Sequence, residues 1–197
     1  MADSDPWAGM AWTTPPRVWS VEADGTGRAE AGPGTDFWQR TFYGFERDNG
    51  HALLARRAGD FTAELAFEAD YQVLYDQAGL MLRADATRWI KFGVELTDGA
   101  PHLSVVVTHG TSDWSARPIV LNGLLRIRAT RLGEAVLLQH RSDAGEWQMA
   151  RLAPFSADDI GVGPYLCTPE RKAGEAAFVA RFLDFTVIEP VVRALHD

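Results

Sequence analysis

A chain of 197 residues with 46% hydrophobic and 23% charged residues has the apolar content of one globular domain of ordinary size. Its formal net charge of −8 argues against nucleic-acid and anionic-membrane partners, because binding to phosphate needs clustered lysine and arginine. Cys167 is the only cysteine, which excludes a disulfide within the chain and fits a reducing compartment.

The two ends of the chain differ in composition from its middle. Residues 1–16 are rich in proline, tryptophan and small residues, and they predict a leader loosely attached to a single domain at residues 17–190. Residues 191–197 are expected to form a tail. The first residues show neither the basic nor the apolar segment of a secretory signal, and no stretch reaches the roughly 18 apolar residues of a membrane-spanning helix. We therefore expect a cytoplasmic protein.

Alternation of apolar and polar residues predicts strands throughout the domain. In residues 61–71, Phe61, Leu65 and Phe67 fall on one side and the polar residues between them fall on the other. This period of two is typical of a half-buried strand, and residues 89–96 repeat it. Further strands are predicted at residues 17–21, 51–57, 77–84, 102–109, 115–120, 123–131, 134–141, 146–151, 162–167 and 176–189.

Short segments rich in glycine, aspartate and asparagine separate the predicted strands. The strongest hairpin signal is Asp98-Gly99, because these residues readily adopt the backbone angles of a two-residue turn. Similar turns are predicted at Asp48-Asn49-Gly50, Leu132-Gly133-Glu134 and Asp143-Ala144-Gly145, and a short helical turn at residues 156–160 with Ser156 as its N-cap. Many short strands with few helical windows predict an all-β sandwich or barrel.

Several blocks of the sequence together resemble a known family. Residues 71–95 contain an A-G-L-M strand followed by a W-I-K-F-G strand, and they are similar to the concanavalin A-like family numbered 1349 among domains of unknown function, some members of which are named for regulation of enolase. The resemblance covers residues 12–188. It also rests on Thr35–Trp38 with Tyr43–Phe45 and Asn49–His51, on Leu103–Thr108 with Ser112–Ser115, and on Val162–Tyr165 with Cys167–Pro169.

The resemblance implies a two-sheet, concanavalin A-like jelly-roll sandwich. The A-G-L and W-I-K segments also resemble the accessory sandwich domain of some β-xylosidases. This second resemblance links the fold to carbohydrate by analogy alone. The family has no settled activity, so the resemblance implies a fold more firmly than a function.

The polar side of the strand that begins at Trp89 is the first candidate ligand-binding face. Lys91 and Glu95 project from it together with Trp89, and Gln77 and Asp76 come from the strand expected beside it. Sugars are recognised by this mixture, because an aromatic ring packs on their C–H patches while charged and amide groups bind their hydroxyls.

Gly93 lies between these side chains, where the missing side chain would let a ligand approach the backbone. The alternative is an ordinary solvated face with a structural pair of Lys91 and Glu95, which would contribute little energy. The sequence leaves both interpretations open.

Aromatic residues in predicted loops form the second candidate face. Trp38 and Tyr43 cluster in one loop, and Trp114 is expected in the turn after His109. Loop aromatics of this kind can clamp a sugar or a peptide. The alternative is a loop whose aromatics plug the end of the sandwich, and we favour it for the three phenylalanines between residues 37 and 45.

Sequence motifs for catalysis and metal binding are absent. The E-x-D-x-x-E motif of jelly-roll glucanases does not occur, and the remaining carboxylate pairs are Glu64 with Glu68 on one strand and Asp76 with Glu95 across two strands. The histidines lack the spacing of a zinc site, and Cys167 is most simply a buried structural thiol. We expect no catalytic residue, no cofactor and no metal.

These observations favour a non-catalytic sandwich that binds a carbohydrate or a similar polar small molecule. One alternative is a regulatory protein of the cytoplasm that binds another protein, for which the resemblance suggests a metabolic enzyme. A homodimer formed through a sandwich face is compatible with either function. The second alternative is an enzyme similar to glycoside hydrolases, which would need a second carboxyl group beside Glu95.

Overall fold

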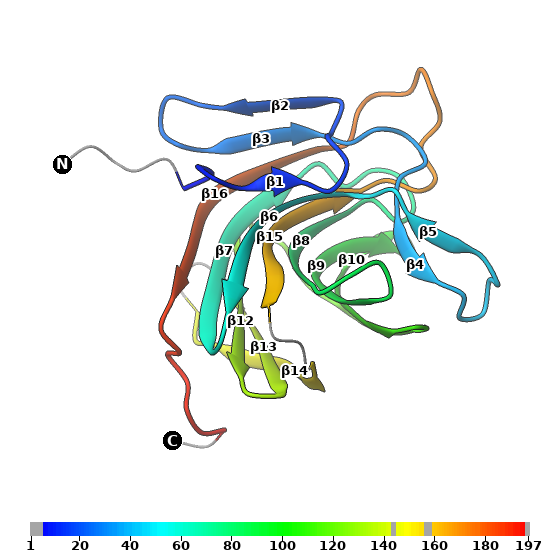
Figure 1. The fold of residues 1–197 in the computed structure, drawn as a ribbon. Coiled ribbons are helices and arrows are strands. Elements are labelled where there is room, and N and C mark those ends of the chain that lie inside the picture. Colours follow the sequence, from blue (N-terminus) through cyan, green and yellow to red (C-terminus); the bar gives the residue numbers. More distant parts are fainter. Residues whose placement is uncertain (1–5, 143–144, 156–158, 196–197) are drawn as a thin grey trace.

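The computed structural model describes residues 6–142, 145–155 and 159–195, and its strands form two large antiparallel sheets and one small one (Figure 1). The first sheet has seven strands in the order β1 (Ala11–Trp12), β6 (His51–Ala58), β15 (Asp159–Cys167), β8 (Gln77–Arg83), β9 (Arg88–Thr97), β10 (Ala100–His109) and β11 (Ser112–Pro118). The second has seven in the order β14 (Gln148–Pro154), β13 (Ala135–Ser142), β12 (Leu125–Leu132), β7 (Phe61–Ala69), β16 (Val179–Ile188), β3 (Gly27–Glu30) and β2 (Val18–Val21). The small sheet is a hairpin of β4 (Phe37–Gln39) and β5 (Glu46–Asp48). The described ranges contain no helix, and so none able to span a membrane.

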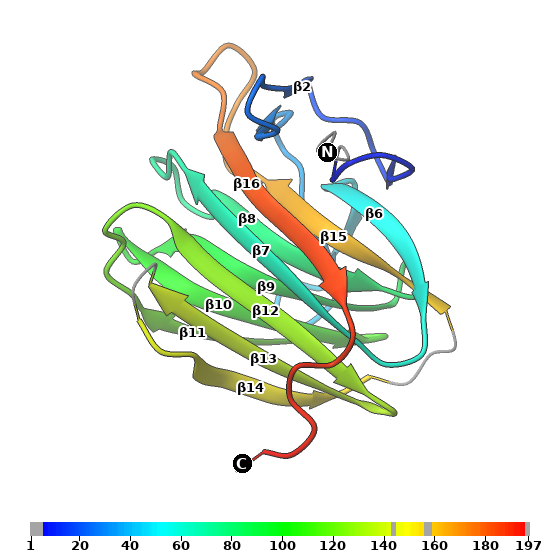
Figure 2. The same cartoon turned by 90° about the vertical axis from the view of Figure 1, so that its left-hand side faces the viewer.

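The two large sheets lie face to face and form a sandwich. Figure 2 shows β7, β12 and β16 of the second sheet in front of β8, β9 and β10 of the first. Alternate side chains fill the space between the sheets: Ile90, Phe92 and Val94 of β9 are buried in one cluster with Leu65 and Phe67 of β7. The predicted two-sheet, all-β sandwich is therefore confirmed, and so is the predicted alternation in these two strands.

Every strand predicted from the sequence is present, with ends that differ by a few residues. The short strands β1, β3, β4 and β5 were not predicted, because two to four residues are too few to show a period. The helical turn predicted around Ser156 lies mostly outside the described residues, and Asp159 begins β15 instead. Most of the turn predicted at residues 143–145 lies outside them too.

The segment predicted as a loose leader belongs to the sandwich from Trp7 onward. The Trp7 ring is buried and stacks on Phe185 with 5.9 Å between ring centroids, and its Nε1 donates a hydrogen bond to the carbonyl of Gly25. β1 adds a further strand beside β6. The expectation of a loosely attached leader is therefore wrong for residues 7–16, since burying a tryptophan stabilises the packed arrangement.

The side of the first sheet that faces away from the second sheet, here called the outer face, carries the candidate site. The β4–β5 hairpin lies against it (Figure 1). Phe37 and Trp38 of the hairpin pack with Met81, Trp89 and Val106 in a second hydrophobic cluster, separate from the core between the sheets. The hairpin therefore covers one end of the outer face and leaves the other end accessible.

Candidate functional site

A pocket of about 210 Å³ lies on the outer face of the first sheet, beside the β4–β5 hairpin. Strands β8, β9 and β10 form its floor, and its walls come from the hairpin, the loop before β8, strand β11 and the loop after β15. The residues that line it are Asp36, Trp38, Tyr43, Phe45, Tyr75, Gln77, Lys91, Glu95, Val106, Trp114, Pro169 and Glu170.

Strand register brings the floor residues together. Gln77 pairs with Glu95 across β8 and β9, and Val106 pairs with Lys91 across β9 and β10. Directly paired residues project to the same face of a sheet, and residues two apart on one strand do so too. The alternation that buries Ile90 and Phe92 between the sheets therefore directs Lys91 and Glu95 into the pocket.

Lys91 is buried in a closed polar network at the base of the pocket. Its Nζ donates hydrogen bonds to Gln77 Oε1 at 2.6 Å and to Asp36 Oδ1 at 3.2 Å, and only 3% of its side chain is exposed. Burial alone would lower the pKa of Lys91, but the carboxylates of Asp36 and Glu95 raise it above its ordinary value. The ammonium group therefore stays charged, and Asp36 balances it.

Glu95 contributes a buried carboxylate that is only partly engaged. Ser104 Oγ donates a hydrogen bond to Glu95 Oε2 at 2.7 Å, and Trp114 Nε1 donates to Ser104 Oγ at 2.9 Å. Burial raises the pKa of Glu95 above its ordinary value, while Lys91 and Ser104 oppose the rise. Among the described residues, no other hydrogen bond and no ion pair reaches this carboxylate. It can therefore accept a hydrogen bond from a ligand.

Aromatic rings form the walls. Tyr43 contacts Trp38 edge to face and stacks on Phe45, with ring centroids 5.8 and 5.4 Å apart, while Tyr75 meets Trp114 at 6.4 Å. The hydroxyls of Tyr43 and Tyr75 lie 3.3 Å apart and join the two groups of rings. This hydrogen bond and burial raise the pKa of Tyr75 well above its ordinary value, so its hydroxyl keeps its proton.

The structure brings six of the eight sequence-predicted ligand-binding residues to this pocket: Trp38, Tyr43, Gln77, Lys91, Glu95 and Trp114. The other two, Trp89 and Asp76, do not line it.

Trp89 projects to the expected side of β9 but is 0% exposed. Its ring packs against Phe37 with 6.1 Å between centroids, and its Nε1 donates a hydrogen bond to the Ala86 carbonyl at 3.2 Å. The prediction of a solvent-facing indole is therefore wrong, because the hairpin that covers this end of the face is distant in sequence and was not predicted.

Asp76 is fully buried and faces away from the pocket. Arg171 binds both of its carboxylate oxygens, at 2.9 and 2.6 Å, and Thr168 Oγ1 donates to one of them at 2.7 Å. Asp76 therefore ties the loop after β15 to the loop before β8. The prediction of Asp76 as a ligand-binding residue is wrong, and the carboxylate pair of Asp76 and Glu95 that the sequence left open does not form in the pocket.

Several lining residues were not predicted. Tyr75 lies in a loop with a positive φ of 63°, a conformation that no local signal in the sequence marks for a tyrosine. Glu170 follows β15 at a point where nothing in the pattern indicates a wall. Phe45 was assigned to a plug, whereas 39% of its surface is exposed and its ring lines the pocket. Ser104 does not line the pocket but holds Glu95, and it could have been found from the alternation along β10 if the register with β9 had been known.

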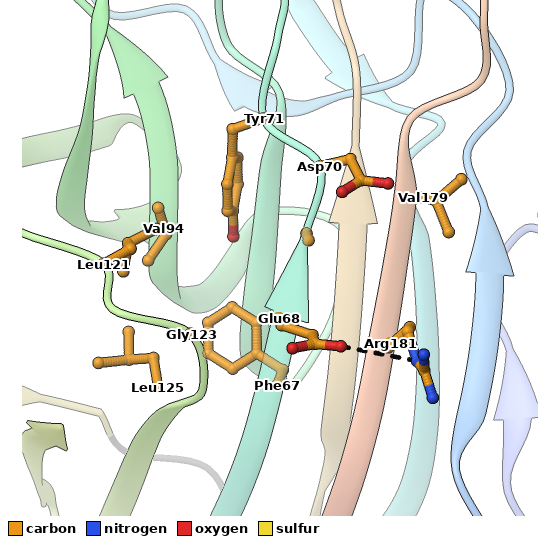
Figure 3. A pocket seen from close by; sticks show the side chains of 11 residues that line it. Phe67, Glu68, Asp70, Tyr71, Val94, Leu121, Gly123, Leu125, Val179 and Arg181 are labelled. Atoms are coloured by element: carbon orange, nitrogen blue, oxygen red, sulfur yellow. Dashed lines mark ion pairs between the residues drawn. The ribbon is translucent and has the colours of Figure 1, made fainter. Parts of the chain in front are cut away.

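A larger cavity of about 370 Å³ opens at the end of the sandwich, beside β7 and β16 (Figure 3). Val94 and Phe67 form apolar walls, and Glu68 lies 3.7 Å from Arg181 in an ion pair at its edge. The Tyr71 hydroxyl is buried there with no hydrogen-bond partner among the described residues. The charged groups of this cavity partly satisfy one another, and no predicted site residue lies in it, so the pocket on the outer face is the better candidate.

The other chemical candidates are also accounted for. Glu64 pairs with Arg128 at 3.5 Å and Glu68 pairs with Arg181, both on the second sheet and away from the pocket. Burial raises the pKa of the Cys167 thiol far above its ordinary value, which disfavours the reactive thiolate. Within the part of the chain that the structure describes, no group of histidine, cysteine and carboxylate side chains is arranged to hold a metal ion.

Known proteins resemble the chain over nearly its full length. "Regulation of enolase protein 1" of Saccharomyces cerevisiae is 40% identical over 190 residues, which cover 94% of this chain and 92% of that protein. The crystal structure of a functionally unknown protein from Saccharomyces cerevisiae matches with a TM-score of 0.88 and 37% identity, and covers 94% of this chain and 99% of that chain.

More distant structures share the fold alone. Xylan beta-1,4-xylosidase from Bacillus halodurans matches with a TM-score of 0.66 and 16% identity, over 87% of this chain and 34% of that chain. The predicted resemblance to the sandwich of β-xylosidases is thereby confirmed at the level of fold. Residues 12–190 match the family model described as "Protein of unknown function (DUF1349)", and the chain belongs to this family.

Proposed function

We propose that the pocket on the outer face binds a carbohydrate or a similar polar small molecule and catalyses no reaction on it. The observation that carries this proposal is the incompletely engaged Glu95 carboxylate beside the rings of Tyr75 and Trp114. Polar ligands with apolar faces need both features, since rings pack on C–H groups while a carboxylate binds hydroxyl or amine protons. The sandwich fold shared with a xylosidase is compatible with such a ligand.

The engagement of Asp36, the other buried carboxylate of the pocket, favours binding over catalysis. Asp36 Oδ1 accepts hydrogen bonds from Lys91 Nζ and from the backbone N–H of Phe37 at 2.8 Å. An inverting or a retaining hydrolase needs two carboxyl groups that can act on the substrate. Asp36 instead holds Lys91 and the start of the β4–β5 hairpin, which is a structural task. The third carboxylate of the lining, Glu170, is exposed, and no hydrogen bond to a described residue positions it for catalysis.

Calorimetric titration with a panel of simple sugars, after a glycan-array screen, tests the proposal. We expect Glu95→Gln and Trp114→Ala each to weaken binding at least about tenfold, since each removes a principal ligand contact. Matched controls are Glu189→Gln, whose side chain is 92% exposed, and Val120→Ala, at a residue that is 83% exposed and does not line the pocket. Absence of binding to the whole panel, or equal affinities in wild type and both pocket variants, would contradict the proposal.

A second candidate function, binding to another protein, is favoured by the tip of the β4–β5 hairpin. The Phe42 side chain is 91% exposed and stands edge to face on Tyr43. Exposed aromatic groups of this kind are frequent anchors in protein interfaces, and the name of the yeast relative refers to regulation of enolase. A regulatory role in the cytoplasm, with a metabolic enzyme as partner or with self-association into a dimer, is the corresponding proposal.

Affinity capture and sedimentation of the purified chain test this second candidate. Phe42→Ala should abolish a reproducible partner or a dimer, whereas Val120→Ala, at another site that is 83% exposed, should retain it. Equal recovery with both variants would count against the hairpin as an interface.

A further inference from the structure

We propose that the ligand of the outer-face pocket carries an ammonium group, so that the pocket takes a small organic cation such as an alkylammonium ion or an amino sugar. This inference rests on the proposed function, because it names the chemical class of ligand for the same pocket. Three observations lead to it: the charges left unbalanced in the pocket, the rings around them and the size of the space.

The charges that line the pocket do not cancel. Lys91 is the only cation among the described lining residues, and its ion pair with Asp36 balances it. Glu95 and Glu170 form no ion pair with any described residue. Both lie close enough to the Tyr75 hydroxyl to add to the rise of its pKa, which the hydrogen bond with Tyr43 and burial dominate.

An anionic ligand would be repelled by this unbalanced negative charge, and a neutral ligand would leave it uncompensated. A cation would compensate it, and the attraction is strong here because Glu95 is only 6% exposed and therefore weakly screened by solvent.

The aromatic walls suit the same kind of ligand. Tyr43, Tyr75 and Trp114 come from the hairpin, the loop before β8 and strand β11, and all three line one small space. A cation within about 6 Å of ring centroids is attracted by the negative charge of the ring faces, and several rings around one space form the cage that recognises alkylated ammonium groups. Phe45 already shows this attraction, because the guanidinium of Arg47 lies over its ring at 5.0 Å.

The size of the pocket limits the ligand to a small molecule or a single head group. Its volume of about 210 Å³ is below the roughly 300–1,000 Å³ of pockets for drug-sized ligands. An ammonium group with a few carbon substituents, or one amino sugar ring, is of a suitable size. Longer oligosaccharides would have to extend beyond the walls.

Titrations with two matched pairs of ligands test the inference on the intact protein. The first pair is choline and its uncharged analogue 3,3-dimethylbutan-1-ol, and the second is glucosamine and glucose. We expect the charged member of at least one pair to bind at least tenfold more tightly at neutral pH and moderate salt. The pair that shows the preference distinguishes an alkylammonium ligand from an amino sugar.

Variants then assign the preference to the pocket. Glu95→Gln should reduce the preference for the charged ligand at least tenfold. Glu170→Gln should reduce this preference severalfold, and because Glu170 is exposed, the substitution does not endanger folding. Glu189→Gln and Val120→Ala, both at exposed positions outside the pocket, should leave the preference unchanged.

Neutral members that bind as well as the charged ones would overturn the inference and leave the proposed function standing. Failure of all four compounds, together with silence across the sugar panel, would overturn both. A preference for the charged members that survives Glu95→Gln and Glu170→Gln would place the cation elsewhere and would also overturn the inference.

Discussion

The hydroxyl of Ser104 donates a hydrogen bond to the Glu95 carboxylate at 2.7 Å. The same oxygen accepts a hydrogen bond from the Trp114 indole at 2.9 Å. A hydroxyl has a single proton to donate, so these two bonds give the chain from indole to hydroxyl to carboxylate a fixed direction. Ser104 therefore positions the acidic group of the pocket and one of its aromatic walls at the same time, although it does not line the pocket itself.

Ser104→Ala removes both bonds. We expect the pKa of Glu95 to rise further above its ordinary value, because the lost hydrogen bond favours the ionised carboxylate. The free energy of unfolding should fall by about 1–3 kcal/mol, because the Trp114 indole N–H is left without its acceptor.

An NMR titration of the Glu95 side-chain carboxyl carbon measures the pKa, and a denaturant titration measures the free energy of unfolding. Ser20→Ala, at an exposed position of β2, is the control. An unchanged or lowered pKa of Glu95 would show that the hydroxyl does not hold the carboxylate in its ionised form.

The raised pKa of Glu95 predicts that Glu95→Gln changes stability in a pH-dependent way. Folding favours the protonated carboxyl, so its contribution to stability is complete below the ordinary pKa of 4.5 and is lost as pH rises through the higher pKa of the folded protein. Wild type should therefore lose stability relative to Glu95→Gln as pH rises from below 4.5 through the raised pKa of the folded protein. Denaturant titrations at several pH values measure this difference.

Other charged groups also face Glu95, namely Asp36, Lys91 and His102. The comparison should be repeated in a His102→Gln background, which removes the electrostatic interaction between His102 and Glu95. A stability difference that stays constant with pH, or that moves in favour of wild type as pH rises, would contradict the prediction.

The fold and much of the pocket floor were predictable because they depend on local periodicity. Alternation along β9 places Lys91 and Glu95 on one face and Phe92 on the other whatever the rest of the chain does. Aspartate and glycine at Asp98-Gly99 place the turn between β9 and β10, where the left-handed φ of both residues is observed.

Which end of the outer face is open was not predictable, because it depends on contacts between residues distant in the chain. Phe37 covers Trp89 from a hairpin about fifty residues away, and Tyr75 faces Trp114 from a loop. Alternation along a strand predicts to which face of the sheet a tryptophan projects, but it does not predict which other segment covers that face. The pattern therefore predicts Trp89 in the site, where it does not lie, and gives no indication of Tyr75, which lines the pocket.

Gly93 serves the pairing of strands rather than the approach of a ligand. A Cβ atom at this position would lie 2.1 Å from the Ala78 carbonyl oxygen and 2.7 Å from the Gly79 Cα, both backbone atoms of the neighbouring strand. Gly93→Ala should therefore lower the free energy of unfolding by about 1–3 kcal/mol or more, because the β8 and β9 backbones must separate. Gly32→Ala is the matched control, since its Cβ would have no neighbour closer than 3.5 Å, and it should change stability by less than about 1 kcal/mol. Thermal unfolding of the two variants measures the difference. Equal changes in stability would contradict the pairing role and would support the interpretation that Gly93 leaves space for a ligand.

The buried pair of Asp76 and Arg171 supports the pocket from behind. Tyr75 and Glu170 line the pocket, and each is the chain neighbour of one member of the pair. Arg171 also donates a hydrogen bond to the carbonyl of Ala176, which closes its own loop. The pair therefore fixes the two loops from which these two pocket residues project.

Asp76→Asn breaks this pair and leaves the Arg171 guanidinium, whose side chain is 4% exposed, without a charge partner. We expect the free energy of unfolding to fall by about 3–5 kcal/mol, because an unbalanced buried charge is costly. Asp159→Asn provides the matched comparison, since the Asp159–Arg56 pair has the same chemistry at the surface and should contribute less than about 1 kcal/mol. Denaturant titrations of both variants decide the matter. Equal losses would mean that burial adds nothing to the Asp76 pair, and the two loops would then need another anchor to keep Tyr75 and Glu170 in the pocket.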